Sequence, residues 1–126
     1  MNETLYQRLG GVDRISSIVE ESIDRQTVNP LLAPRFRGKD LPHLKKLGTQ
    51  FFCAGIGGPQ AYEGRDLRAA HAGLNVSEQE FIATVDDIVD ALASHGVAQA
   101  ETNEVVAILY SLKGDRSEEH TSELQA

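Results

Sequence analysis

The sequence contains no tryptophan, a single cysteine and four prolines in 126 residues. One cysteine cannot form an internal disulfide, and the first residues lack the basic and then apolar pattern of a secretion signal, so we expect a cytoplasmic protein. A run of about 18 apolar residues is also missing, which argues against a membrane span. The 12 basic residues are outnumbered by 19 acidic ones, and this balance disfavours nucleic-acid binding because phosphate neutralisation supplies much of that affinity.

What is present is a series of helical patterns separated by glycine and proline. The first clear helix is predicted to begin at an N-cap on Asp13, after the glycine pair at 10 and 11. Its apolar residues recur at three- and four-residue spacing: Ile15, Ile18, Val19 and Ile23. The stretch 29–40 is predicted to be a loop anchored by Phe36. A solvated basic face is expected from Arg35, Arg37, Lys39, Lys45 and Lys46.

A second strong helix is predicted after Asp40, which can cap it, with Pro42 in the first turn. Its apolar residues are Leu41, Leu44, Leu47, Phe51 and Phe52. The last two are predicted to be core residues.

Two more helices follow. Ser77 and Glu80 form the capping-box pattern S-x-x-E, which predicts a helix ending at Gly96. A last helix is predicted from a cap at Thr102 to Gly114. No segment shows strand alternation, so the fold class is all-α with four main helices in a single domain.

The final segment differs from the rest of the chain. "RSEEHTSELQ", from residue 116, is polar and lacks helical periodicity. It is similar to an in-frame translation of a widely used short-read sequencing adapter. We therefore expect a domain over residues 1–115 and a non-native or disordered tail over 116–126.

Most site chemistries find little support in the sequence. The four histidines, His43, His71, His95 and His120, are scattered singly, whereas a metal site built from protein ligands needs several at set spacings. Cys53 lies in an apolar run and is predicted to be an inert core residue. Neither a nucleophile–base pair nor a phosphate-binding glycine motif is recognisable, which leaves hydrolase and nucleotide-dependent functions unsupported.

His71 is the residue that raises a question, because it lies among small residues in "RAAHAG" without an acidic neighbour. One interpretation is a structural or surface histidine. The other is an axial ligand of haem iron, which needs one neutral imidazole and small neighbours that let a wide planar ring approach. Composition alone leaves both open.

Several stretches together resemble the truncated haemoglobins of group I: "LYQRLGG", "LAPRFRG", "FF" followed by "GIGGP", "YEGRDLRAAHAGL" and "VDALASHGV". The resemblance covers the chain from Leu5 to about Leu112. It implies a truncated globin-like two-over-two helical sandwich that holds haem b, with His71 as the proximal iron ligand. Haem contacts are then expected from Phe36, Leu44, Gly48, Phe51, Arg68, Val76, Phe81 and Ile88. Arg65 and Arg68 are candidate partners of the haem propionates. For Phe51 and Phe52 the resemblance implies the lining of a gas tunnel, as the alternative to a place in the core.

The distal side departs from the family pattern. Group I members usually carry a tyrosine and glutamines that donate hydrogen bonds to bound dioxygen, and the matching positions here are Ile23, Leu44 and Gly48. None of these side chains can donate. A one-residue shift in register would instead place Thr49 or His43 near the iron, and His43 as a sixth ligand is a further alternative.

The resemblance implies reversible binding of oxygen, carbon monoxide or nitric oxide in a donor-poor pocket. Carriage, sensing and nitric oxide dioxygenation all stay open, and the last would need an external reductase. We expect a monomer or weak homo-oligomer. Alternative functions are a haem-binding or structural helical protein without oxygen carriage, and a helical interaction module without a cofactor.

Overall fold

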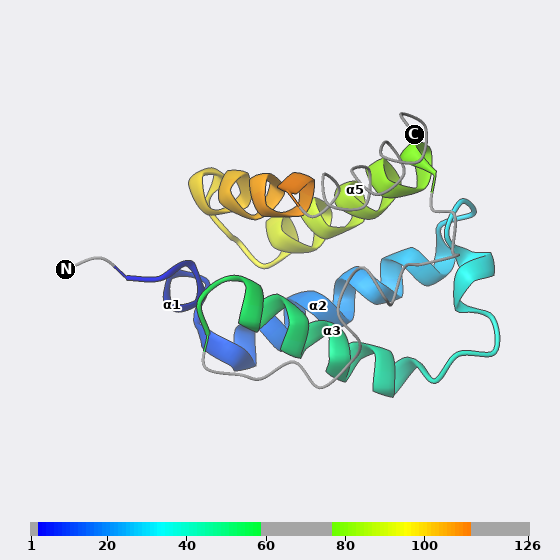
Figure 1. Ribbon diagram of the computed structural model, residues 1–126, viewed down its shortest axis with the longest axis horizontal. Helices are drawn as coiled ribbons and strands as arrows, with labels where there is room; N and C mark the ends of the chain where they lie inside the picture. The colour runs from blue at the N-terminus through cyan, green and yellow to red at the C-terminus, as the bar shows by residue number, and fades with distance from the viewer. Residues whose placement is uncertain (1–2, 59–76, 112–126) are drawn as a thin grey trace, which may run out of the picture.

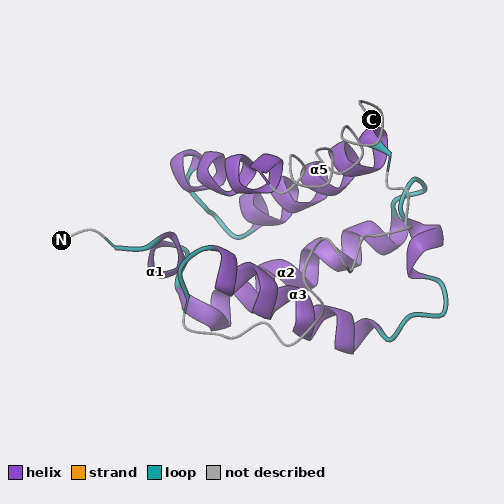
Figure 2. Ribbon diagram, in the orientation of Figure 1, coloured by secondary structure: helices purple, strands orange, loops and turns teal. Residues whose placement is uncertain are grey.

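The computed structural model describes residues 3–58 and 77–111, and all regular structure in these ranges is helical. The elements are α1 (Leu5–Arg8), α2 (Gly11–Val28), the 3-10 helix η1 (Ala33–Phe36), α3 (Leu41–Gly55), α5 (Glu78–Ser94) and a helix over 99–111. Figure 1 shows α2 and α3 in one layer, with α5 and the 99–111 helix in the other. The secondary-structure view gives the same arrangement (Figure 2). This confirms the predicted all-α, two-over-two sandwich.

The core of the described part lies around α2, which contacts both α3 and α5. The buried residues Ile15, Ile18 and Val19 of α2 belong to one cluster with Cys53 of α3 and Leu92 of α5. Cys53 is fully buried, which confirms its predicted place in the core, and burial raises the pKa of its thiol. Each helix in 3–58 and 77–111 is too short or too polar to cross a bilayer.

Two of the predicted helix caps are confirmed. Asp40 accepts a hydrogen bond from the backbone N–H of His43 at 3.1 Å, at the start of α3. Ser77 and Glu80 form a reciprocal capping box, in which each side chain accepts from the other residue's backbone N–H. These caps fix where α3 and α5 begin, because they satisfy backbone donors that have no partner within the helix.

Two other predicted caps are wrong. α2 begins at Gly11, with Gly10 as N-cap in the left-handed region at φ +102°, and Asp13 lies in its first turn. Glycine is the residue that adopts this conformation without strain, so the chain turns into α2 earlier than the carboxylate suggested. Thr102 lies within the helix over 99–111 and is buried.

The connection between α2 and α3 is also more ordered than the loop that the prolines predicted. It contains η1, and its buried anchor is Leu32, which is 3% exposed, whereas Phe36 is half-buried. The expected solvated basic face is wrong for two of its members. Arg35 pairs with Glu80 of α5, and Lys45 Nζ lies 2.8 Å from Asp24 Oδ1 of α2.

Candidate functional site

The predicted site residues divide into two groups. Arg65, Arg68, His71 and Val76 lie outside the described residues. The tail from 116 and the domain boundary before it also lie outside, and that boundary stays a prediction. The remaining site residues come from four elements of both layers: Ile23 of α2, Phe36 of η1, Leu44, Gly48 and Phe51 of α3, and Phe81 and Ile88 of α5.

The structure brings Ile23 and Gly48 together where α2 crosses α3. A Cβ atom at Gly48 would lie 3.6 Å from Ile23 Cδ1 and 3.2 Å from Val19 Cγ1. The second distance is tighter than ordinary van der Waals contact, so the absence of a side chain at 48 allows this close approach of the two helices. Leu44 lies one turn earlier on α3 and is half-buried. At this crossing the predicted distal positions therefore present aliphatic groups and bare backbone.

An ion pair joins the same two helices beside this crossing. Asp24 and Lys45 follow Ile23 and Leu44 in the sequence, and their side chains meet at 2.8 Å. Lys45 is 24% exposed and Asp24 is 62% exposed. At such exposure the pair contributes little stability, and its charges lie toward solvent.

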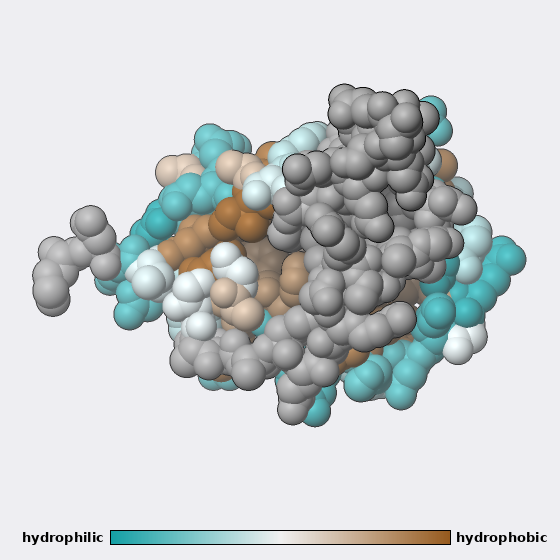
Figure 3. Space-filling model, in the orientation of Figure 1, coloured by the Kyte–Doolittle hydropathy of each residue, from teal (hydrophilic) through white to brown (hydrophobic). Residues whose placement is uncertain are grey.

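On the α5 side, the predicted contacts are apolar and differ in burial. Phe81 is buried, and its ring meets Tyr110 edge to face at 5.2 Å between centroids. Ile88, two turns later, is partly buried and packs against the core. Phe36 of η1 and Phe51 of α3 are half-buried. On the face shown in Figure 3, hydrophobic surface lies between the two helix layers, next to the region drawn in grey.

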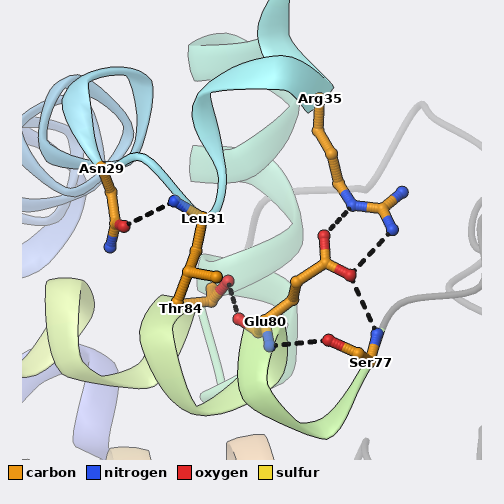
Figure 4. A network of polar contacts seen from close by, with 6 residues as sticks. All are labelled: Asn29, Leu31, Arg35, Ser77, Glu80 and Thr84. Carbon is orange, nitrogen blue, oxygen red and sulfur yellow. Dashed lines mark hydrogen bonds and ion pairs between the residues drawn. The ribbon is translucent and has the colours of Figure 1, made fainter.

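A polar network missed by the sequence reasoning joins η1 to the start of α5 (Figure 4). Arg35 makes a two-pronged ion pair with Glu80, with Nε on one carboxylate oxygen and Nη2 on the other at 3.0 Å. Hydrogen bonds from Arg35, and then from the Ser77 backbone, lower the pKa of Glu80 to about 2. The hydrogen bonds to Glu80 likewise raise the pKa of Arg35, because they stabilise its charged form. The capping-box pattern identified Glu80, but nothing local in the sequence marks a partner 45 residues away.

The alternative distal candidates are placed as follows. His43 is exposed on the first turn of α3. The hydroxyl of Thr49 is directed to its own helix, because it donates to the carbonyl of Lys45 at 2.9 Å. His95, which is not a distal candidate, ends α5, and its Nδ1 lies 2.9 Å from the carbonyl oxygen of Ala91. Within 3–58 and 77–111, no three His, Cys, Asp or Glu residues gather as a metal site would require.

Comparisons with known proteins agree with this architecture. The family model for the bacterial-like globins matches residues 4–117. The group 1 truncated haemoglobin GlbN of Nostoc sp. (strain MUN 8820) is 32% identical over 111 residues, covering 88% of this chain and 94% of that protein.

Solved structures extend the likeness to three dimensions. The truncated haemoglobin of Tetrahymena pyriformis, in its Fe(III) form, superposes with a TM-score of 0.86 at 26% identity, over 90% of this chain and 97% of that one. Chlamydomonas reinhardtii THB1 matches with a TM-score of 0.74 at 30% identity, over 90% of this chain and 95% of that one. The chain therefore belongs to the bacterial-like globin family, and within it to the group I truncated haemoglobins.

Proposed function

We propose that this globin holds haem b through His71 and binds diatomic gases in a distal pocket without a hydrogen-bond donor. The observation that carries the proposal is the close approach of Ile23 to Gly48, because the Ile23 side chain lies 3.6 Å from the position that a Cβ would take at that glycine. A pocket built this way retains ligands that need no donor, such as carbon monoxide and nitric oxide, better than it retains dioxygen.

The described residues fit the faces of an apolar, planar cofactor. The expected haem contacts in 3–58 and 77–111 are five hydrocarbon side chains and one glycine, and the distal position Ile23 adds a sixth hydrocarbon side chain; together they come from both layers. Five of these side chains are only half-buried: Ile23, Phe36, Leu44, Phe51 and Ile88. Apolar surface left partly exposed between two layers is what a porphyrin would cover, with a gain of about 25 cal/mol per Å².

A comparison within the family supports the assignment of the distal positions. Structures of the Tetrahymena pyriformis protein include variants in which a tyrosine is replaced by phenylalanine and each of two glutamines by glutamate. The spacing of these three residues along that chain equals the spacing of Ile23, Leu44 and Gly48 here. We infer that the same three places in this chain lack the polar side chains found there.

Each residue has a defined task in this proposal. When bound, haem supplies an iron atom that takes a gas molecule reversibly. His71 would hold that iron through a neutral imidazole. Phe36 packs on the ring, while Arg65 and Arg68 pair with the propionates. Ile23, Leu44 and Gly48 exclude water from the distal side and offer bound dioxygen no hydrogen bond.

The test is reconstitution of the chain with hemin, followed by spectra of the ferric, ferrous and carbon-monoxide forms. We expect a strong Soret band, five-coordinate ferrous haem, and loss of the normal ferrous spectrum in His71→Ala. His43→Ala is the matched control, because His43 is exposed on α3 and should leave the spectrum unchanged. A colourless protein, or a spectrum that responds to His43 and not to His71, would overturn the assignment.

For the physiological role we propose a class of function, the use of a gas-binding haem, without choosing one use within it. Carriage, sensing and nitric oxide dioxygenation all use a gas-binding haem, and dioxygenation also needs electrons from an external reductase. We propose a cytoplasmic protein that acts as a monomer or weak homo-oligomer. Size-exclusion chromatography with light scattering tests the last point.

A further inference from the structure

We propose that a polar clamp between η1 and α5 holds the two helix layers at the spacing that retains haem. The clamp consists of Arg35 and Asn29 on the α2–α3 connection and Glu80 and Asp87 on α5. The inference rests on the proposed function, because the cofactor it retains is the haem assigned there. It assigns positioning roles to residues that touch neither the iron nor the gas.

The first half of the clamp is the two-pronged pair of Arg35 and Glu80 (Figure 4). Their side chains are 32% and 16% exposed, so water screens this pair less than an ion pair on an open surface. The carboxylate of Glu80 also accepts from the Ser77 backbone N–H at 3.1 Å, and the Glu80 N–H donates to the Ser77 hydroxyl at 3.0 Å. The capping box therefore helps to orient the carboxylate that Arg35 binds.

The second half lies further along α5. Asn29, the C-cap residue of α2, donates through its side-chain amide to Asp87 at 3.1 Å and accepts from the N–H of Leu31 at 3.1 Å. Glu80 and Asp87 are seven residues apart and thus lie on one face of α5. The connection 29–36 consequently attaches along two turns of α5, and Leu32 is buried between its two polar ends.

The position of the clamp links it to the proposed cofactor site. Segment 29–36 connects α2 to α3 in one layer, whereas α5 belongs to the other layer, so these bonds cross between layers. Phe36 directly follows Arg35, and Phe81 directly follows Glu80. Any change in the distance between Arg35 and Glu80 therefore moves the backbone at Phe36 and at Phe81, two of the expected haem contacts. A wider spacing would weaken the packing of Phe36 and Phe81 against the bound cofactor.

The chain contains a matched control. Arg8 makes a two-pronged ion pair with Glu104, which joins α1 to the 99–111 helix, and one of its bonds measures 2.8 Å. The Arg8 side chain is 32% exposed, the same fraction as that of Arg35, whereas its partner Glu104 is 45% exposed against 16% for Glu80. Its sequence neighbours are not among the expected haem contacts. Substitution of either arginine should therefore lower the stability of the fold, but only substitution of Arg35 should change the rate of haem loss.

The experiment measures hemin transfer from the reconstituted protein to excess apomyoglobin, together with urea unfolding of the cofactor-free chain. We expect Arg35→Gln to raise the rate of hemin loss about three- to tenfold, and Arg8→Gln to change it less than about twofold. Arg35→Lys keeps the positive charge but cannot form the bidentate pair with the carboxylate, so an intermediate rate of hemin loss is expected. Glu80→Gln is the second variant, because glutamine preserves the capping box while removing the carboxylate charge.

The outcomes separate this inference from the proposed function. Uptake of hemin by the wild type, with equal hemin loss in Arg35→Gln and Arg8→Gln, would overturn the clamp alone. Failure of the wild type to take up hemin would overturn the haem assignment itself. Faster hemin loss in Arg35→Gln, with unfolding midpoints equal in the two variants, would support the clamp.

Discussion

Replacement of Ile23 by tyrosine tests the most specific feature of the distal side. Ile23 is half-buried on α2, and its Cδ1 lies 3.6 Å from the position of a Cβ at Gly48. A longer side chain at 23 can therefore extend over α3 where residue 48 offers no side chain to obstruct it. We expect the phenol hydroxyl of Ile23→Tyr to donate a hydrogen bond to dioxygen in the pocket.

The expected magnitude follows from the strength of that bond. A hydrogen bond to a strongly polarised acceptor contributes about 1.5–3 kcal/mol, and each 1.36 kcal/mol corresponds to a factor of ten in rate. Oxygen dissociation from Ile23→Tyr should therefore be about ten- to a hundredfold slower than from the wild type. Carbon monoxide is less polarised when bound, so its dissociation should change by less than about threefold on the same scale.

Ile23→Phe is the control, because it carries the same ring without the hydroxyl. Oxygen dissociation is followed in a stopped-flow instrument by displacement with carbon monoxide, and ligand association by laser photolysis. Steric effects of the ring appear in both variants, whereas the hydrogen bond appears only in Ile23→Tyr. Equal oxygen dissociation rates in the two variants would refute the donor-poor account of the pocket.

Three further predictions concern packing, pH and capping. Gly48→Ala should raise the free energy of unfolding by about 1 kcal/mol through helix propensity, but only in a Val19→Ala background, because the new Cβ lies 3.2 Å from Val19 Cγ1 when valine is present. Urea unfolding of the wild type, the two single variants and the double variant should give a coupling energy of about 1–2 kcal/mol between the two positions. A coupling energy near zero would contradict the contact. Glu80 has a folded pKa of about 2 against an ordinary value of 4.5, so its contribution is fully present above pH 4.5 and is lost as pH falls toward 2. The stability difference between wild type and Glu80→Gln should shrink over that window, and a difference independent of pH would exclude the ion pair as its source. Ser77→Ala should destabilise the chain by about 1 kcal/mol through loss of the α5 cap, while Ser77→Thr, which keeps the acceptor, should remain near the wild type in thermal melts.

The features that could be predicted from sequence are those whose partners lie close together in the chain. Asp40 and the Ser77–Glu80 box were identifiable because a cap and the backbone donor that it satisfies are three residues apart. The start of α2 was misplaced because Gly10 turns the chain by adopting a positive φ, and a glycine pair does not show which residue will do so.

Contacts between distant segments could not be predicted in the same way. Arg35 and Lys45 belong to a run of basic residues that resembles a solvated surface, yet each pairs with an acidic residue of another helix. The choice of partner depends on how the layers pack, and helical periodicity carries no information about that. The resemblance to group I truncated haemoglobins supplied the layer arrangement, and the distal positions followed from it by their place in the sequence.

The geometry at Gly48 also decides how polarity can be restored to the distal side. A glutamine at 48 would begin with a Cβ 3.2 Å from Val19 Cγ1, so the Val19 side chain would have to shift by a few tenths of an ångström to accommodate it. At position 23 the corresponding distance is longer, because Ile23 Cδ1 lies 3.6 Å from the position of a Cβ at Gly48, an ordinary van der Waals contact. The close crossing of α2 and α3 and the absence of a donor are therefore linked. Gly48 permits the close crossing, and because it has no side chain it cannot supply a hydrogen-bond donor at that position. We therefore expect a donor to be recovered more directly at position 23 than at position 48, where the Val19 side chain must first shift.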